Sequence, residues 1–362
     1  MSDNHVFIII PVYNREKLIA ACVQSVMRQT ISSWTAVVVD DGSTDGTAAI
    51  IDSLAEKDDR LNIVHQNNSG IAGARNRGLD EVFTIIHRNK EQLPGRGDIV
   101  DESRNYIMFL DSDDILEPDA MQRSIEIAVN HKADIVQWQA SDFFSNDDNP
   151  EDVSKKRVRN GDGIKEKAEI VTDSKGALEI LLDTKGKGAD KRFRFLWNDC
   201  RCVWTKMCAE ALYEGVRCPE GKSYEDDFIV DDLFMRAEKI VFVNESLTNY
   251  RFHSGNFLRT TRLKDMLDHT ECERNRFVHA ASYNDSNLTK MAFHNVLMSS
   301  ANSYKLSCKE KCPNGNVWKE LATISRGYEK DFGMVDRIIF EGFKIAPGLM
   351  TLVYEQYRRI KK

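Results

Sequence analysis

Three carboxylates crowd into one short segment, FLDSDD at residues 109–114, directly after an apolar run that is typical of a buried strand. Clustered like charges cost free energy unless a cation or hydrogen-bond donors offset them. Because Mg²⁺ and Mn²⁺ prefer carboxylate and phosphate oxygens, one interpretation is a site for a divalent metal and a diphosphate group. The other is a turn in which Ser112 or Asp113 caps the next helix. The segment alone is consistent with both.

A second acidic segment, VVVDDGSTDGT at residues 37–47, ends a β-branched run with Asp40 and Asp41. A carboxylate fixed at a strand end can accept the N3–H of a uracil ring. Asp45 would fall in the first turn of the following helix, where negative charge is favourable. Taken alone, the segment also fits a plain strand–turn–helix junction. Tyr13, after the first apolar run, has a flat ring that can stack on a base or pack in the core.

A third group of acids, Glu225, Asp226 and Asp227, stands where a helix is expected to begin. Consecutive helical side chains point in different directions, so only one of the three can face a given ligand. An alcohol hydroxyl is hardly ionised at neutral pH, and a carboxylate within hydrogen-bond reach can take its proton as it attacks. The alternative is that these acids only stabilise the first turn of the helix.

The first 140 residues predict the scaffold that positions these groups, because short β-branched runs alternate with segments of helical period. Such alternation indicates βαβ crossovers and a mostly parallel sheet covered by helices on both faces. Ligands bind beyond the carboxyl ends of the strands in these sheets, so Asn14, Asp40 and Asp41, and the acids of 111–114 should meet at one edge. Strands are expected at 6–12, 36–39, 62–65, 106–110 and 134–139, and helices at 16–29, 44–54, from 70, and at 118–130.

The remaining chain is expected to form less regular parts. Residues 84–104 contain Gln, Pro and Gly residues that predict an inserted loop, or a helix plus a loop. Residues 141–194 are polar and predict a solvated insertion or flap with a helix near 174–183. The pattern is helical beyond residue 263 and ends in a net basic amphipathic segment, 336–362. This segment fits an interfacial helix on an anionic membrane or an ordinary packed helix.

Composition and charge exclude several classes of protein. With 362 residues, 41% of them hydrophobic and 30% charged, the chain can bury a sizeable core. Its net charge of −7 gives no basic field for nucleic acid, so no nucleic-acid partner is expected. The chain has no apolar run of membrane-spanning length, and its first residues, MSDNHVFIII, lack the features of a signal peptide. We therefore expect a cytoplasmic protein, whose eight scattered Cys are reduced thiols.

Five segments follow the order and approximate spacing of family 2 glycosyltransferases of the GT-A fold. VFIIIPVYNRE, VVVDDGSTDGT, NSGIAGARNRGL and YIMFLDSDDILEP come first, and EGKSYEDDFIVDDLF follows much later with NYRFHSGN behind it. The resemblance covers about residues 6–256 and implies the Rossmann-like α/β fold of nucleotide-diphospho-sugar transferases, with a C-terminal helical extension. The implied domains are a transferase domain at 1–260 and the extension at 261–362. Within the first, 1–140 would bind the nucleotide-sugar, 141–194 would be the insertion, and 195–260 would carry the acceptor site and catalytic base.

The resemblance implies donor-binding roles for residues at the sheet edge. Pro11, Val12 and Tyr13 would bracket the nucleobase, Asp41 would accept from uracil N3–H, and Arg75 would contact the uridine or diphosphate. Asp111, Ser112 and Asp113 match the DxD element, with Asp113 as the direct metal ligand and Asp111 nearer the ribose or sugar. His253 falls where some family members place a further metal or diphosphate contact.

The resemblance also places the catalytic and acceptor residues. Asp226 matches the catalytic base of the family, and Glu225 is the second choice. Trp204 and Lys206 lie in the region where this fold builds its acceptor pocket. An aromatic face suits the apolar side of a sugar ring, although core packing explains a single Trp as well.

We therefore expect an inverting, metal-dependent glycosyltransferase that uses Mn²⁺ or Mg²⁺. The expected donor is a UDP-hexose or UDP-N-acetylhexosamine, and the expected acceptor is a lipid-linked glycan of surface polysaccharide biosynthesis, reached at the inner face of the membrane through the basic C-terminal helix. A nucleotidyl or phosphoryl transferase is the first alternative, but the chain has no GxxxxGK[ST] loop. A catalytically silent glycan-binding protein is the second, and the presence of every required carboxylate disfavours it.

Overall fold

The chain divides into two compact units. Unit 1 comprises residues 1–177, 185–221 and 225–256, and unit 2 comprises residues 178–184, 222–224 and 257–362. The short segment 222–224 is thus grouped with the C-terminal helices, although unit 1 resumes at Glu225. The structure is a computed structural model that describes residues 4–92, 104–143, 157–158, 167–183, 199–252, 262–350 and 353–354.

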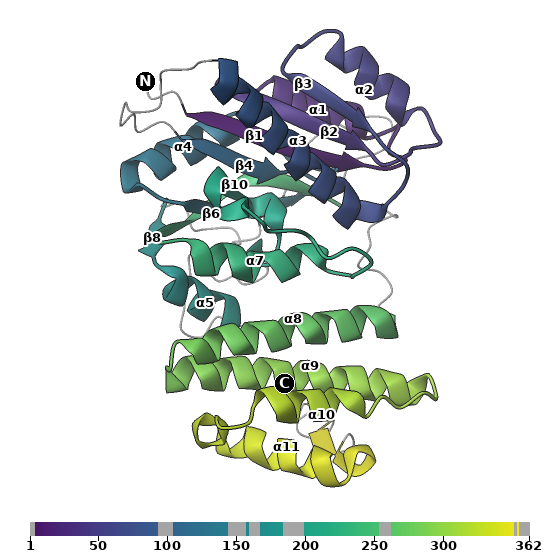
Figure 1. Cartoon of the computed structure of the whole chain (residues 1–362), viewed down its shortest axis with the longest axis vertical. Coiled ribbons are helices and arrows are strands. Elements are labelled where there is room, and N and C mark those ends of the chain that lie inside the picture. Colours follow the sequence, from purple (N-terminus) through teal and green to yellow (C-terminus); the bar gives the residue numbers. More distant parts are fainter. Residues whose placement is uncertain are drawn as a thin grey trace. The chain divides into compact units, whose positions relative to one another are not determined.

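A mostly parallel sheet forms the centre of unit 1 (Figure 1). Its described strands are β1 His5–Val12, β2 Trp34–Asp40, β3 Leu61–His65, β4 Asn105–Phe109, β5 Ile115–Leu116, β6 Ile135–Phe143, β7 Arg157–Val158, β8 Glu169–Thr172, β9 Lys206–Ala209 and β10 Ile240–Arg251. They lie in the order β3-β2-β1-β4-β9-β6-β10-β5, with β7 beside β6 and β8 beside β10. β1 pairs in parallel with β2 and β4, and β6 with β10, whereas β9 runs antiparallel between β4 and β6.

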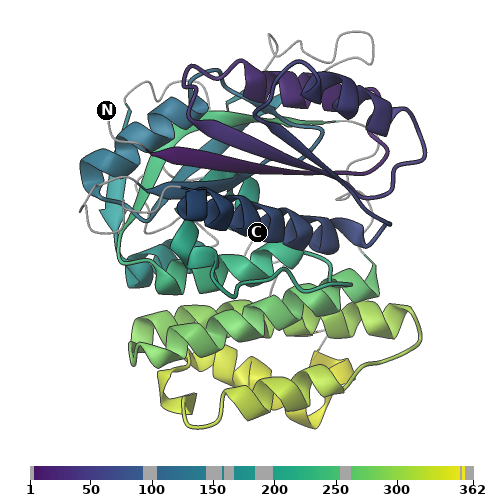
Figure 2. The ribbon, with the colours of Figure 1, turned by 45° about the horizontal axis from the view of Figure 1, so that its top comes forward.

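Helices cover both faces of this sheet. α1 and α2 lie on one face and α3 lies on the other (Figure 2). This arrangement confirms the helix-flanked, mostly parallel α/β fold that the sequence predicts. Another helix, α5 Ser174–Leu182, begins in unit 1 and ends in unit 2. The other described helices of unit 1 include α1 Ile19–Met27, α2 Thr47–Ala55, α3 Gly70–Gln92, α4 Ala120–His131 and α7 Glu225–Arg236.

Close packing at the centre of the sheet fixes where the strands end. The apolar side chains of β1 are buried on both faces, as parallel strands between two helical layers require. α3 lies directly on β1, because a Cβ atom at Gly78 would be only 2.3 Å from Cγ2 of Ile9. The strand registers pair Val12 with Asp40 and Ile9 with Phe109. The loops that follow β1, β2 and β4 therefore leave from the same edge of the sheet.

Two parts of the fold differ from the elements that the sequence predicts. α3 continues to Gln92, so the first part of the predicted insertion at 84–104 is helical, and residues 93–103 lie outside the described residues. Within the predicted flap the helix expected near 174–183 is confirmed as α5. The same region also contributes β8, which pairs antiparallel with β10. The four residues of β8, EIVT, are too short and too exposed to give a clear strand pattern.

Unit 2 is a set of helices with an aromatic core. The ring of Phe293 stacks on Phe332 at 3.5 Å between centroids, and Trp318 stacks on Phe343 at 4.0 Å. Its described helices include α8 Leu263–Ser282, α9 Ser286–Lys309, α10 Asn316–Ile324 and α11 Met334–Ile345. Among the described residues of both units, no helix combines the length and apolar character needed to cross a membrane.

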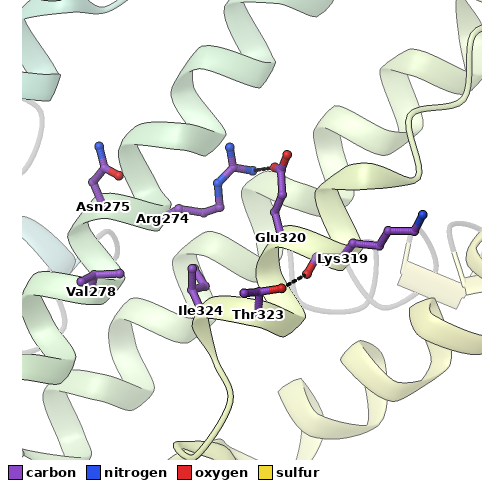
Figure 3. A pocket seen from close by; sticks show the side chains of 7 residues that line it. All are labelled: Arg274, Asn275, Val278, Lys319, Glu320, Thr323 and Ile324. Atoms are coloured by element: carbon purple, nitrogen blue, oxygen red, sulfur yellow. Dashed lines mark hydrogen bonds and ion pairs between the residues drawn. The ribbon is translucent and has the colours of Figure 1, made fainter.

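A pocket of about 350 Å³ lies between α8 and α10 of unit 2 (Figure 3). Arg274 on its wall forms an ion pair with Glu320 at 2.5 Å, and the Thr323 hydroxyl donates to the Lys319 carbonyl. None of the residues for which the sequence predicts chemistry lines this pocket. Its lining consists of Arg274, Asn275, Val278, Lys319, Glu320, Thr323 and Ile324.

Candidate active site

The loops after β1 and β2 are joined by reciprocal hydrogen bonds. The N–H of Asn14 donates to Ser43 Oγ at 3.0 Å, and Asn14 Oδ1 accepts from the N–H of Thr44 at 2.8 Å. Asn14 has a φ of 50°, a left-handed conformation that Asn adopts more readily than most residues. The polar residues of the two motifs therefore fix the loop that carries Tyr13, whose side chain is 44% exposed. Pro11 and Val12 before it are buried in β1.

Asp41 caps the N-terminus of α3. Its Oδ1 accepts from the N–H of Ser69 and its Oδ2 from the N–H of Gly70, both at 2.8 Å. Gln66 also donates to Oδ1, at 2.7 Å. A carboxylate at this point satisfies free helical N–H groups and interacts favourably with the helix dipole. The uracil contact predicted for Asp41 stays a prediction. The carboxylate of Asp41 already holds the N-terminus of α3, the helix that carries Arg75.

The turn after β4 holds Asp111, Ser112 and Asp113, the residues that match a DxD element, and is called the DxD turn below. The N–H of Asp114 donates to the Asp111 carbonyl at 3.0 Å, and Ser112 between them is buried. The Asp113 carboxylate lies 3.7 Å from Arg15 Nε. Burial raises the pKa of Asp114 well above its usual range, and the charges of Asp113 and Asp111 raise it further. The predicted crowding of like charges is therefore present at this edge of the sheet.

Arg75 joins the DxD turn to the start of α7. Its Nη2 donates to Asp111 Oδ1 at 2.9 Å, and its Nη1 forms an ion pair with Glu225. The side chain is only 2% exposed. Burial alone would lower the pKa of this guanidinium, but Glu225 and Asp111 raise it above its usual value. The donor contact predicted for Arg75 stays a prediction, whereas its two carboxylate partners were not expected from the sequence.

The three consecutive acids of α7 have different surroundings. Glu225 pairs with Arg75, and Asp227 pairs with Arg201 at 3.2 Å. Asp226 makes no ion pair with any side chain that the structure describes, and its Oδ1 accepts from the N–H of Asp227 at 3.0 Å. Burial and the neighbouring Glu225 raise the pKa of Asp226 to about 7. A carboxyl group of this kind is suited to accept a proton near neutral pH.

Arg251, at the end of β10, is a site residue that the sequence analysis missed. Its Nε donates to the Asp113 carbonyl at 2.6 Å, and its N–H donates to Asp114 Oδ1 at 2.9 Å. The side chain is 1% exposed, with its guanidinium 4.6 Å from the centroid of Phe143. Arg251 belongs to the motif NYRFHSGN, from which the sequence analysis assigns a role only to His253. His253 itself lies outside the described residues.

Trp204 and Lys206, the two residues predicted to bind the acceptor, have different surroundings. The Trp204 ring stacks on Tyr250 with 5.5 Å between centroids. Lys206 is buried, and its ammonium group donates to the carbonyls of Cys200, at 3.1 Å, and Cys202. Burial lowers the pKa of Lys206. Acceptor binding by Trp204 and Lys206 stays a prediction.

Asp111 and Asp113 are the residues of the DxD turn that could hold a metal. Among the residues that the structure describes, no three His, Cys, Asp or Glu side chains converge on a ready-made metal site. Asp111 and Asp113 are 25% and 18% exposed, so both carboxylates reach solvent at the sheet edge. Mg²⁺ is usually bound by one or two carboxylates together with phosphate oxygens of the substrate. The two carboxylates of the DxD turn fit this mode of binding.

Residues 7–174 match the family model described as Glycosyl transferase family 2. The chain carries a family 2 glycosyltransferase domain. This confirms the family that the order of the motifs predicted. The matched range includes the strand-end loops, Arg75 and the DxD turn of the glycosyltransferase domain, whereas Glu225 and Asp226 lie beyond it.

Similar proteins place this glycosyltransferase domain among bacterial relatives. Glycosyltransferase GlyA of Streptococcus pneumoniae serotype 4 (strain ATCC BAA-334 / TIGR4) is 30% identical over 257 residues, which are 71% of this chain and 32% of GlyA. The chain thus spans about a third of the length of that relative. The putative teichuronic acid biosynthesis glycosyltransferase TuaG of Bacillus subtilis (strain 168) is 35% identical over 122 residues, 33% of this chain and 40% of TuaG.

Solved structures show the same fold. The crystal structure of S. aureus TarS 1-349 matches with a TM-score of 0.66 and 19% identity, covering 98% of this chain and 91% of that chain. TarS 1-349 has also been solved in complex with UDP, at a TM-score of 0.66, and in complex with UDP-GlcNAc, at 0.57. At this level of identity the likeness supports the GT-A fold of the glycosyltransferase domain.

Replacing Arg251 by Met should destabilise unit 1, because the Asp113 carbonyl loses a buried hydrogen bond beside three carboxylates. We expect the free energy of unfolding to fall by about 1–3 kcal/mol in urea denaturation. Arg217→Met is the control: Arg217 makes an exposed ion pair with Asp80, so its loss should cost at most about 1 kcal/mol. Equal losses in the two variants would contradict the role of Arg251 at the DxD turn.

Proposed function

We propose that the chain transfers a sugar from a UDP-activated donor to a hydroxyl group of a glycan acceptor. The observation that carries the proposal is the chain of ion pairs in which Arg75 joins Asp111 of the DxD turn to Glu225, directly before Asp226. These ion pairs bring Asp111 and the acids at the start of α7 together at one edge of a glycosyltransferase domain, which supports the proposal. TarS, which shares the fold and has been solved with UDP and UDP-GlcNAc, supports the choice of donor.

The donor would lie across the strand ends. In this proposal the exposed ring of Tyr13 stacks on uracil beside the backbone of Pro11 and Val12, and Asp41 accepts from the uracil N3–H. Asp111 and Ser112 would lie near the ribose. Arg75, besides holding the carboxylates, is close enough to the DxD turn to contribute positive charge toward the diphosphate.

Asp111 and Asp113 would hold Mn²⁺ or Mg²⁺, and His253 is proposed as a further contact. When bound, the metal neutralises negative charge that develops on the departing diphosphate. Arg251 supports the turn from the protein side through the Asp113 carbonyl and the Asp114 carboxylate. The chain's own contribution to the leaving group is therefore a fixed turn that does not have to rearrange as charge develops.

Asp226 is the proposed catalytic base. It takes the proton of the acceptor hydroxyl while that oxygen forms a bond to the anomeric carbon, and the bond from this carbon to the diphosphate oxygen breaks. UDP leaves with the bonding electrons, and a single in-line displacement inverts the configuration at the anomeric carbon. Glu225 is the second choice for the base, and its ion pair with Arg75 favours a supporting role.

The acceptor is proposed to be a lipid-linked glycan of a bacterial surface polysaccharide. The name of TuaG, a putative teichuronic acid biosynthesis glycosyltransferase, supports a polysaccharide pathway. Trp204, stacked on Tyr250, would provide an aromatic wall for the acceptor sugar. Lys206 would support this wall by fixing the carbonyls of Cys200 and Cys202.

An exposed apolar row on α11 supports contact with a membrane. Met334, Ile338 and Ile345 are 76%, 63% and 84% exposed, whereas Phe340 and Phe343 of the same helix are buried. The basic residues Arg337 and Lys344 lie within the same helix. Apolar side chains flanked by basic ones are typical of helices that lie on an anionic bilayer surface. We propose that this row contacts the anionic membrane that holds the acceptor.

The base assignment predicts the pH dependence of transfer. Because the pKa of Asp226 is raised to about 7, log kcat/KM should rise by about one per pH unit below pH 7 and level off above it, where the base is ionised. Asp226→Asn should remove this dependence and lower kcat by about 10²–10⁴-fold, with UDP affinity within a few-fold. Asp232→Asn on the same helix is the control. Loss of UDP binding together with turnover would remove Asp226 from the role of base.

The donor assignment predicts selective stabilisation by ligands. In a thermal-shift panel of UDP-, GDP-, dTDP- and CMP-sugars with and without Mn²⁺, only UDP-sugars with Mn²⁺ should raise the melting temperature strongly, since ligand at about 100 times Kd adds about 2.7 kcal/mol. Asp113→Ala should abolish the Mn²⁺-dependent part, and Asp119→Ala, at an exposed position after the turn, should not. An absence of any nucleotide shift would contradict the donor site.

The membrane proposal predicts that vesicle binding depends on the α11 row. Replacing Met334, Ile338 and Ile345 together by Gln should reduce co-sedimentation with phosphatidylglycerol vesicles by at least about tenfold, because apolar burial supplies much of the affinity. Val129→Gln, at another exposed apolar position, should leave binding unchanged. Equal partitioning of the triple variant and the wild type would refute the proposal.

A further inference from the structure

The segment immediately before the candidate base is held by α8. The N–H of Ser223 donates to Asp268 Oδ2 at 2.9 Å, and the Ser223 hydroxyl donates to Asp265 Oδ1 at 2.6 Å. Ser223, Asp265 and Asp268 are all buried. Lys222 adds ion pairs to Asp268 at 3.3 Å and to Glu271 at 2.7 Å. Both the backbone and the side chain of Ser223 are thus fixed by carboxylates of one helix.

The two carboxylates that hold Ser223 are themselves held in their charged form. Arg262 donates to both oxygens of Asp265, at 3.1 and 2.9 Å, and lowers the pKa of that carboxyl well below its usual range. Burial alone would raise the pKa of Asp268, but hydrogen bonds from Lys264 and Ser223 lower it below its usual value. Hydrogen bonds to ionised acceptors are roughly twice as strong as those between neutral groups.

The backbone on either side of Ser223 needs such support. Gly221 has a φ of 73° and Tyr224 a φ of 60°, both in the left-handed region. This region is unfavourable for a bulky residue such as Tyr and persists only where surrounding contacts impose it. The Tyr224 ring packs edge-on against His269, with 5.7 Å between centroids. Contacts with α8 therefore fix the backbone of residues 222–224, which directly precede α7 in the chain.

We propose that Asp265 and Asp268 are positioning residues for Asp226, acting through Ser223. The inference rests on the proposed function of Asp226 as the base. Asp226 is the third residue after Ser223, and its carboxylate accepts from the N–H of Asp227 in the first turn of α7. A change in the start of this helix would move that carboxylate, and a displacement of about 1 Å at a reacting group can cost about 10²-fold in rate.

Turnover and donor affinity separate this role from simple stabilisation. We expect Ser223→Ala and Asp268→Ala to lower kcat by at least about tenfold, while the Kd for UDP with Mn²⁺, measured by calorimetry, stays within about twofold. Asp268→Asn keeps an oxygen that accepts from the Ser223 N–H and should recover most of the activity. Glu271 lies on α8 like Asp268 but pairs with Lys222 and not with Ser223, so Glu271→Ala should leave kcat unchanged. An equal loss in Glu271→Ala, or a kcat of Asp268→Ala within twofold of the wild type, would overturn the proposal.

Hydrogen exchange tests the same contact without any sugar transfer. In Asp268→Ala, the amides of Asp226 and Asp227 should exchange at least about tenfold faster than in the wild type and in Glu271→Ala. Unchanged exchange at these amides would overturn the positioning role even if kcat fell. If the wild type transferred no sugar, the proposed function would fail on its own. Hydrogen exchange would then still decide whether the contacts of Ser223 with Asp265 and Asp268 order the first turn of α7. A catalytic role for these contacts would be rejected.

Discussion

A buried guanidinium holds the acidic elements of the site together. Arg75 is almost fully buried and pairs with Asp111 after β4 and with Glu225 at the start of α7. A buried charge without partners is very costly, and removing one member of such a group is strongly destabilising. The two carboxylates would in turn repel each other without the arginine. Each charge therefore requires the others, and this requirement sets the spacing between the DxD turn and the first turn of α7.

The same crowding of charge gives neighbouring residues different chemistry. Glu225 is paired with Arg75, and Asp227 is paired with Arg201. The pKa of Asp226 is set mainly by its burial and by the like charge of Glu225. Its pKa therefore rises, whereas an ion-paired carboxylate would be a weaker base. Three adjacent acids, alike in sequence, thus have different electrostatic surroundings because their partners differ.

The sequence predicts the edge of the sheet well because strand ends converge by topology alone. Asn14, Asp41 and the DxD turn follow parallel strands, and no knowledge of long-range contacts is needed to bring them together. The partners of Arg75 could not be predicted in this way, since nothing local in GARNRG indicates that its side chain contacts α7. Arg251 was missed for the same reason: an arginine at a strand end is usually exposed, and only the fold shows it buried beneath the turn. The contacts of residues 222–224 likewise depend on a helix some forty residues later.

Under the proposed function, Asp41 both recognises the nucleobase and holds the architecture of the site, with a consequence for how such a domain can diverge. Its carboxylate caps the helix that carries Arg75, so an exchange at this position would loosen that helix as well as alter base recognition. Evolution toward another nucleotide is therefore constrained at Asp41 itself. The exposed side chain of Tyr13 differs from Asp41, because the hydrogen bonds that fix its loop come from Asn14 and Glu16 and not from the ring. Under the proposed function, Tyr13 is therefore the position where donor preference can drift without loss of the fold.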